Sequence, residues 1–302
     1  LSAMTSDDLL DCLIIGGGAA GLTAAVYFGR YRRRVLVLDD DDSRLKWIPR
    51  TRNVLGFPDG IEGPELLERL REHARRYEVP TERVRVESLR QQADGSFVAE
   101  AAGRSWRGRY ALLATGARDV VPEVDGFADG LRAGQVRFCP VCDGFETQGK
   151  KVAVLGRGAH GLRESLFIAN FGNEVTWLAM ASQEDVAPPD LAQLRAAGVR
   201  IAASAPRGIA CGADCGVRVT LQDEQVLEFD TLYPALGLTH ACDLAATLGA
   251  RVQADGQVEV DAHQQTSVPG LYAAGDVAVD LNQISVAAGH AAIAATAIHN
   301  RL

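Results

Sequence analysis

The stretch Leu13-Ile14-Ile15-Gly16-Gly17-Gly18-Ala19-Ala20-Gly21 decides the fold of this chain. Its first residues are an apolar run typical of a buried parallel strand, and its glycines follow the spacing GxGxxG. Gly16 permits a tight turn, Gly18 lets the backbone approach a pyrophosphate, and Gly21 lets the following helix pack on the strand. That helix points unpaired N–H groups and a positive dipole end at the phosphates. The stretch therefore predicts a dinucleotide-binding strand–turn–helix unit.

A second unit of this kind and an acidic residue strengthen the prediction. Asp39 ends the next apolar run, about twenty residues after the first turn, where an acid accepts hydrogen bonds from ribose hydroxyl groups. Near mid-chain, Gly156-Arg157-Gly158-Ala159-His160-Gly161 follows another apolar run at residues 152–155. We therefore expect an α/β protein with two three-layer, doubly wound (Rossmann-like) domains. Helices are also expected at residues 65–77 and 284–300, and a strand at residues 84–87.

Composition narrows the class of protein. The 302 residues suffice for about two domains, and an apolar fraction of 47% supports a sizeable core. The net charge of −8 argues against a nucleic-acid partner, because phosphate binding needs a basic surface. No run of about 18 apolar residues predicts a membrane span, and no signal peptide follows Met4. We expect a cytoplasmic protein, in which paired cysteines are catalytic or metal-binding.

The paired cysteines are Cys139-Pro140-Val141-Cys142, and Asp143 follows them. Two cysteines at this spacing can close a small disulfide, and an acid beside them can transfer protons. A zinc site would need a second pair, which Cys211 and Cys215 could supply, although no supporting histidine accompanies them. In a thioredoxin module the CxxC opens a helix, whereas here Asp-Gly and a strand follow. These features favour a redox-active disulfide.

The segment Thr266-Ser-Val-Pro-Gly-Leu-Tyr-Ala-Ala-Gly-Asp276 adds a family resemblance. Together with the first glycine turn, the motif at residues 56–67, Ala114-Thr-Gly-Ala117 and the CxxC, it resembles the low-molecular-weight thioredoxin reductase family. The resemblance runs from about residue 11 to residue 300. It implies a homodimer whose FAD-binding domain comprises residues 11–118 and 243–302. An NAD(P)-binding-like domain, residues 119–242, would be inserted and would carry the CxxC.

The resemblance also implies residue roles. Cys142 would face the flavin, Cys139 would attack an external disulfide, and Asp143 would be the acid–base. The helix that starts near Ile284 would aim its N-terminus at the pyrimidine end of the flavin. The residues expected to hold FAD are Gly16, Gly18, Ala19, Ala20, Gly21, Asp39, Gly116, Gly275, Asp276, Gln283 and Ile284.

The second glycine turn departs from the family pattern. Family members carry His-Arg-Arg after the next strand, to bind the 2′-phosphate of NADPH, whereas this chain has Ala179, Met180 and Ala181. No Lys or Arg occurs between Arg163 and Arg195. A phosphate would find no bidentate arginine here, so NADPH is doubtful. The turn at Gly156, Gly158 and Gly161 is left open to another adenine nucleotide, even a second flavin.

Three functions compete. The favoured one is an FAD-dependent reductase of thioredoxin or a similar protein, with electrons from ferredoxin or another flavin. The second is a dithiol oxidase, in which the cysteines oxidise a small dithiol and the flavin reduces oxygen. The third is a non-catalytic flavin redox sensor, which the CxxC and its acid disfavour.

Overall fold

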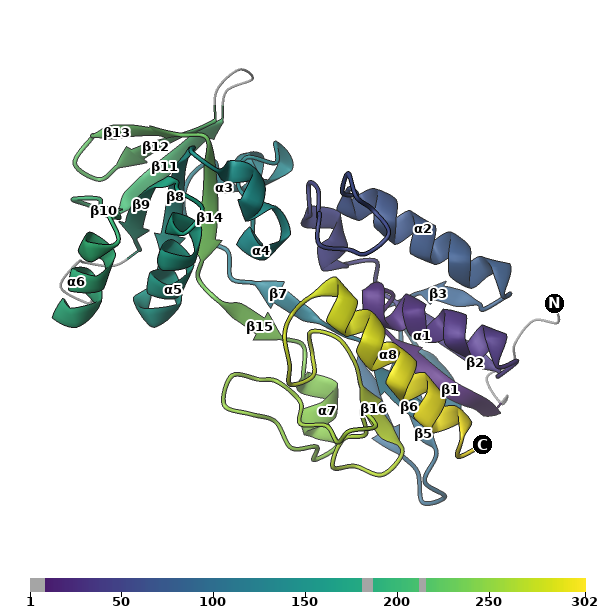
Figure 1. The fold of residues 1–302 in the computed structure, drawn as a ribbon. Helices are drawn as coiled ribbons and strands as arrows, with labels where there is room; N and C mark the ends of the chain where they lie inside the picture. Colours follow the sequence, from purple (N-terminus) through teal and green to yellow (C-terminus); the bar gives the residue numbers. More distant parts are fainter. Residues whose placement is uncertain (1–8, 181–186, 212–215) are drawn as a thin grey trace. The chain divides into compact units, whose positions relative to one another are not determined.

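The computed structural model describes residues 9–180, 187–211 and 216–302, and these divide into two compact units. The first unit is built from three parts of the chain, Leu1–Lys46, Pro64–Arg118 and Thr239–Leu302. The second contains Trp47–Gly63 and Asp119–Leu238 (Figure 1). None of the helices in the described residues is both long and apolar enough to cross a membrane.

The first unit is a seven-stranded sheet with the order β3-β2-β1-β6-β5-β4, in which β16 also pairs with β6. Strands β3, β2, β1, β6 and β16 run parallel, whereas β5 and β4 continue the sheet as an antiparallel ribbon. The helices α1 and α8 pack against each other. Its elements are β1 (Leu9–Ile15), α1 (Ala19–Arg30), β2 (Val35–Asp39), η1 (Arg44–Trp47), α2 (Gly63–Arg76), β3 (Thr81–Arg83), β4 (Ser88–Gln91), β5 (Phe97–Ala101), β6 (Arg104–Leu113), β7 (Ala117–Asp119), β15 (Leu238–His240), α7 (Asp243–Thr247), β16 (Leu271–Ala273) and α8 (Ile284–His299).

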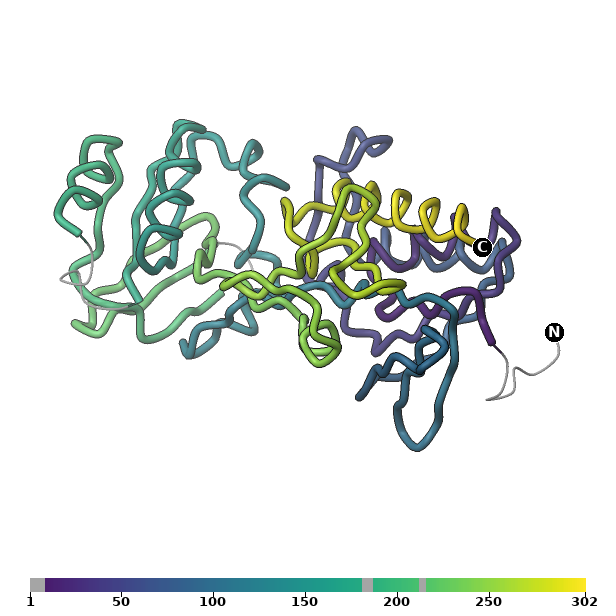
Figure 2. The backbone as a smooth tube through the Cα atoms, turned by 90° about the horizontal axis from the view of Figure 1, so that it is seen from below, coloured from purple at the N-terminus to yellow at the C-terminus, as the bar shows by residue number. Residues whose placement is uncertain are grey.

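The second unit has a four-stranded parallel sheet with the order β10-β9-β8-β14 and a separate antiparallel sheet, β11-β12-β13 (Figure 2 follows the chain through both). The chain goes from β8 to β9 on one side, and β14 joins β8 on the other. Its elements are α3 (Phe127–Arg132), α4 (Pro140–Asp143), η2 (Gly144–Thr147), β8 (Lys151–Gly156), α5 (Gly158–Ala169), β9 (Glu174–Ala179), α6 (Pro188–Ala196), β10 (Arg200–Ile201), β11 (Pro206–Cys211), β12 (Val217–Leu221), β13 (Val226–Phe229) and β14 (Thr231–Ala235).

Alternation along β8 explains the layers of the second unit. Val152 and Val154 share an apolar cluster with Leu162 of α5 and Leu194 of α6. Ala153 and its alternate neighbour Leu155 belong to the opposite cluster, which contains the inward residues of β12. Successive side chains of a strand point to opposite faces, so the sheet carries helices on one face and the small sheet on the other. The predicted fold class, an α/β protein with two Rossmann-like domains built on parallel sheets, is confirmed.

Two details differ from the sequence prediction. Residues 84–87 are not a strand but the connection between β3 and β4, because the backbone of Val84 bonds to Asp39 and then leaves the sheet. The contacts also divide the chain differently from the predicted domain bounds, which stay a prediction: Trp47–Gly63 groups with the second unit, and that unit ends at Leu238. Trp47–Gly63 groups with the second unit because its residues Arg52 and Asn53 form hydrogen bonds with the disulfide segment, as described below.

Candidate nucleotide sites and redox disulfide

The first glycine turn is closed so tightly that side chains are excluded. Gly16 has φ of 108°, and a Cβ there would lie 2.2 Å from the carbonyl oxygen of Ala114. A Cβ on Gly21 would lie 1.8 Å from the oxygen of Gly16. Gly18 caps α1 without any side-chain hydrogen bond, so the first N–H groups of the helix stay available to a ligand. The predicted turn is therefore a cradle that only glycine can form.

Asp39 lies beside this turn, at the end of β2. Its buried carboxylate accepts a 2.9 Å hydrogen bond from the N–H of Gly17. The other carboxylate oxygen lies 3.5 Å from the guanidinium of Arg71 in α2. The carboxylate is thus fixed at the edge of the turn, where the sequence analysis expects a ribose acceptor.

The last segment of the chain reaches the same place. Gly275, with φ of 77°, brings the backbone so close that a Cβ would meet the Cβ of Ala20 at 2.9 Å. The next residue, Asp276, pairs with Arg44 at 2.6 Å. Sequence reasoning missed Arg44, since its only signal was a cation after the acidic run 39–42. Gly116, also expected at the cofactor, has φ of 69° and accepts a backbone bond from Ala241.

The start of α8 completes the candidate FAD site. Gln283 is the N-cap residue and Ile284 the first helical residue of this 16-residue helix. The side-chain oxygen of Asn282 is buried and has no hydrogen-bond partner among the described residues. Together with the glycine cradle, this orphaned oxygen fits a site shaped for a ligand that carries phosphates and hydrogen-bonding rings.

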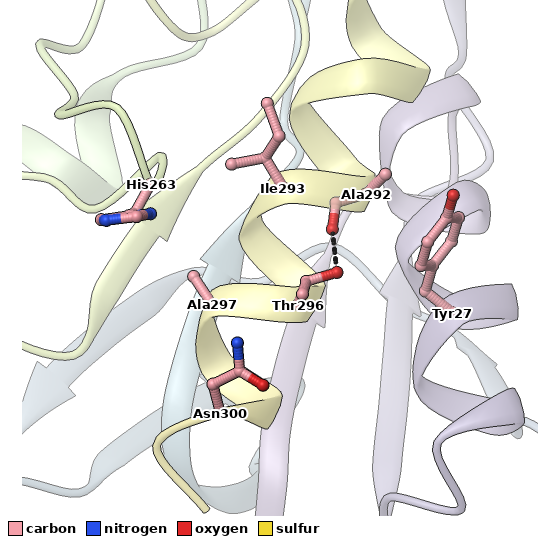
Figure 3. A pocket seen from close by; sticks show the side chains of 7 residues that line it. All are labelled: Tyr27, His263, Ala292, Ile293, Thr296, Ala297 and Asn300. Carbon is pink, nitrogen blue, oxygen red and sulfur yellow. Dashed lines mark hydrogen bonds between the residues drawn. The ribbon is translucent and has the colours of Figure 1, made fainter.

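A separate hollow of about 420 Å³ lies toward the other end of α8 (Figure 3). It is lined by Tyr27 of α1, by His263, and at the end of α8 by Ala292, Ile293, Thr296, Ala297 and the C-cap residue Asn300. Figure 3 shows the Thr296 hydroxyl turned back onto the Ala292 carbonyl, a 2.7 Å bond within the helix. None of the residues predicted to hold FAD lines this hollow.

In the second unit, Cys139 and Cys142 form a disulfide. Cys142 is 7% exposed, whereas Cys139 is half-buried. Contrary to expectation, the CxxC does open a helix, the four-residue α4 with Cys139 as its N-cap. Pro140 favours this start, because its fixed φ suits the first turn.

The segment Thr51–Asn53 covers the disulfide from a distant part of the chain. Arg52 donates its backbone N–H to the carbonyl of Cys142 at 3.0 Å. The amide nitrogen of Asn53 lies 4.0 Å from the sulfur of Cys142. These contacts explain why Trp47–Gly63 groups with the second unit, and they give the buried sulfur a polar neighbour that the sequence did not reveal.

Asp143 is 4% exposed and directly follows Cys142. It accepts hydrogen bonds from Tyr233 at 2.7 Å and from Arg137 at 3.2 Å. Burial raises the pKa of Asp143 above its ordinary value, and the two donors act against that rise. An acid with a raised proton affinity that directly follows a cysteine pair is better suited to accept a thiol proton than an ordinary carboxylate.

The second glycine turn also packs closely, but the strand after it, β9, ends in Ala179 where β2 ends in Asp39. Gly156 and Gly161 approach so closely that a Cβ on either would lie 2.7 Å from the other's Cα. Strand β9 ends at the buried Ala179, followed by the half-buried Met180. Burial and nearby Arg163 lower the pKa of His160 at the start of α5, which favours its neutral form. Ala179 and Met180, the described residues at the end of β9, therefore offer no cation to a 2′-phosphate.

Some predicted residues lie outside the described residues, namely Met4, Ala181 and Cys215. Within the described ranges, no group of three or more His, Cys, Asp and Glu side chains could hold a metal ion.

Comparison with known proteins identifies the family. The pattern of the pyridine nucleotide-disulphide oxidoreductase family matches residues 10–291. The chain belongs to this family. Within it, the chain is a thioredoxin reductase-like, FAD-dependent disulfide oxidoreductase, as predicted.

Individual family relatives agree in sequence and in fold. Thioredoxin reductase of Aquifex aeolicus is 32% identical over 97% of this chain and 93% of its own length. The crystal structure of thioredoxin reductase from Streptococcus pyogenes has a TM-score of 0.88 at 26% identity, covering 97% of each chain. The crystal structure of HlmI has a TM-score of 0.90 at 25% identity, covering 99% of this chain and 94% of the other.

Proposed function

We propose that this enzyme moves electrons between FAD and the Cys139–Cys142 pair, reduces the disulfide of a thioredoxin-like protein, and uses an electron donor other than NADPH. The observation that carries the proposal on the donor is the end of β9. Ala179 and Met180 stand there without charge, and the sequence has no Lys or Arg between Arg163 and Arg195. A dianionic phosphate needs charge-assisted hydrogen bonds that these residues do not supply.

The first unit has the residues needed to hold FAD. The turn from Gly16 to Gly21 would take the pyrophosphate on the N–H groups of α1, and Asp39 would accept from the ribose. The positive end of α8 would lie toward the flavin ring, with Gln283 and Asn282 as hydrogen-bonding groups. When bound, FAD supplies a carrier for two electrons.

The second unit has the residues needed for thiol–disulfide exchange. Cys139 is the more exposed residue of the pair and would attack the partner's disulfide, and the buried Cys142 would then close the ring. Asp143 would take the proton of the Cys142 thiol. The greater exposure of Cys139 supports this division of roles, because a protein disulfide cannot reach a buried sulfur.

The test is an anaerobic titration of the flavin-loaded protein with NADPH and then with NADH, in which the flavin absorbance at about 450 nm is followed. We expect little bleaching by either nucleotide and full bleaching by dithionite or dithiothreitol. Rapid bleaching by stoichiometric NADPH would overturn the proposal on the donor.

A gain-of-function variant sharpens this test. Met180→Arg returns one guanidinium to the position after β9, and Met180→Gln is the matched uncharged control. We expect Met180→Arg to tighten NADPH binding about tenfold over Met180→Gln, because a charge-assisted bond to phosphate forms. Equal affinity for both variants would show that another feature excludes NADPH.

The same preparation separates the alternative functions. A dithiol oxidase would consume oxygen with a small dithiol, and Cys142→Ser would abolish that activity. A flavin redox sensor would keep its function in Cys142→Ser. The expected homodimer, cytoplasmic location, ferredoxin donor and second adenine nucleotide remain predictions.

A further inference from the structure

Both carboxylate oxygens of Asp143 have a donor of their own. The hydroxyl of Tyr233 donates to Oδ1 at 2.7 Å, and the guanidinium of Arg137 donates to Oδ2 at 3.2 Å. Tyr233 is 1% exposed, so its hydroxyl has left water and made this bond instead. Two donors on two oxygens fix the plane of the carboxyl group of Asp143, the residue that follows Cys142.

Strand β14 anchors both donors. Tyr233 is in this strand, which pairs in parallel with β8. The segment before the CxxC runs beside it, since Arg137 donates its N–H to the Leu232 carbonyl at 2.9 Å and Leu232 donates to Gln135 at 3.0 Å. The guanidinium is fixed further by a 2.9 Å bond from its Nε to the carbonyl of Gly134. The two donors therefore reach Asp143 from a rigid sheet edge.

We propose, resting on the function above, that Tyr233 and Arg137 are positioning residues that orient Asp143 and hold it as the base that receives the Cys142 proton. The step is balanced. The Cys142 thiol gives its proton to Asp143, its sulfur bonds to Cys139, and the bond from Cys139 to the partner's sulfur breaks. The partner leaves as a thiolate, so the enzyme dithiol is oxidised and the partner disulfide is reduced.

The charges around Asp143 agree with this role. Burial raises its pKa, Glu146 of η2 raises it further, and Tyr233 and Arg137 lower it. Glu146 is itself paired with Arg52 at 3.4 Å. The pKa of Tyr233 lies far above its usual value, through burial and through Asp143, so its hydroxyl stays protonated and remains a donor. Loss of either donor would thus raise the pKa of Asp143.

The test uses the disulfide chemistry alone. Protein reduced with dithiothreitol and freed of it is mixed anaerobically with the aromatic disulfide DTNB, and release of the second thiolate reports closure of the Cys139–Cys142 ring. We expect the closure rate of the parent protein to rise with pH as Asp143 becomes a base. In Tyr233→Phe we expect this rise to move to higher pH by about one unit. Arg137→Met should shift it in the same direction, and Arg137→Lys should restore part of the shift.

Two controls separate positioning from general damage. Tyr272→Phe removes another buried hydroxyl that is bonded to an arginine, Arg301, but in the first unit, and should leave the pH profile unchanged. In an Asp143→Asn background only the rise from ionisation of the thiol itself should remain, and adding Tyr233→Phe should not shift it.

The outcomes are distinct. A uniform fall of the closure rate in Tyr233→Phe, with no shift in pH, would overturn the proposal. So would a shift that persists in the Asp143→Asn background. If Tyr233→Phe does not fold, as judged by circular dichroism, the pair Arg137→Met and Arg137→Lys decides alone. Because no external donor takes part, failure of the proposal on NADPH leaves this result unaffected.

Discussion

The two glycine turns of this protein share the order strand, glycine turn and helix, and they differ in backbone detail and in surroundings. Around the first turn, β2 ends in Asp39, whose carboxylate accepts a hydrogen bond from the turn. Asp276, from the last part of the chain, forms an ion pair with Arg44, which follows β2. Around the second, β9 ends in Ala179, and the next described residue, Met180, is uncharged. The comparison teaches that a glycine turn alone does not make two sites alike, because the side chain at the end of the next strand differs between them, and in folds of this kind that position contacts the ribose.

The largest expected effect comes from adding one methyl group to each turn. Gly16→Ala would push a Cβ into the Ala114 carbonyl, so we expect loss of flavin and destabilisation by more than about 3 kcal/mol. Gly158→Ala meets no atom within 4 Å and has only a φ of 52° to accommodate. It should destabilise by about 1 kcal/mol and keep its flavin. Flavin absorbance per chain and thermal unfolding measure both, and a flavin-loaded Gly16→Ala protein would contradict the comparison.

The next effect separates chemistry from nucleotide binding in the second unit. Asp143→Asn keeps the size of the side chain but cannot accept a proton, so we expect disulfide exchange with DTNB to slow by about 100-fold. Flavin content should not change. Asp129→Asn, an exposed acid of the same unit, is the matched control. An unchanged rate in Asp143→Asn would remove Asp143 from the proposed chemistry.

The smallest effect concerns the acid that distinguishes the two turns. Asp39→Asn can still accept from Gly17 but loses its charge, so FAD affinity should fall about tenfold. Asp40→Asn, at the exposed neighbouring position, should have no effect. Fluorescence titration of the flavin-free protein with FAD measures the change. Equal affinity for both variants would mean that Asp39 only supports the turn.

The sequence predicted those parts of the molecule that local rules fix. Glycine spacing, apolar runs and the acid after β2 come from steric limits within a single strand–turn–helix unit. Tyr233 and Asp143 are 90 residues apart, and Arg44 and Asp276 are 232 apart, so no local pattern announces those pairs. The strand expected at residues 84–87 is absent because its neighbour β2 ends at Asp39, opposite Arg83, and offers no further residues to pair with. Helix α4 was missed because a four-residue helix leaves no periodicity to read.

The excursion Trp47–Gly63 has a consequence for how such enzymes can be recombined. Its Arg52 amide bonds to the carbonyl of Cys142, and its Asn53 lies against the Cys142 sulfur. A chimera joined at residues 119 and 238 would import a new thiol pair and leave these native contacts behind. The unit to be exchanged is therefore discontinuous. A chimera that takes both Trp47–Gly63 and Asp119–Leu238 from the same enzyme should keep the native contacts around the Cys142 sulfur.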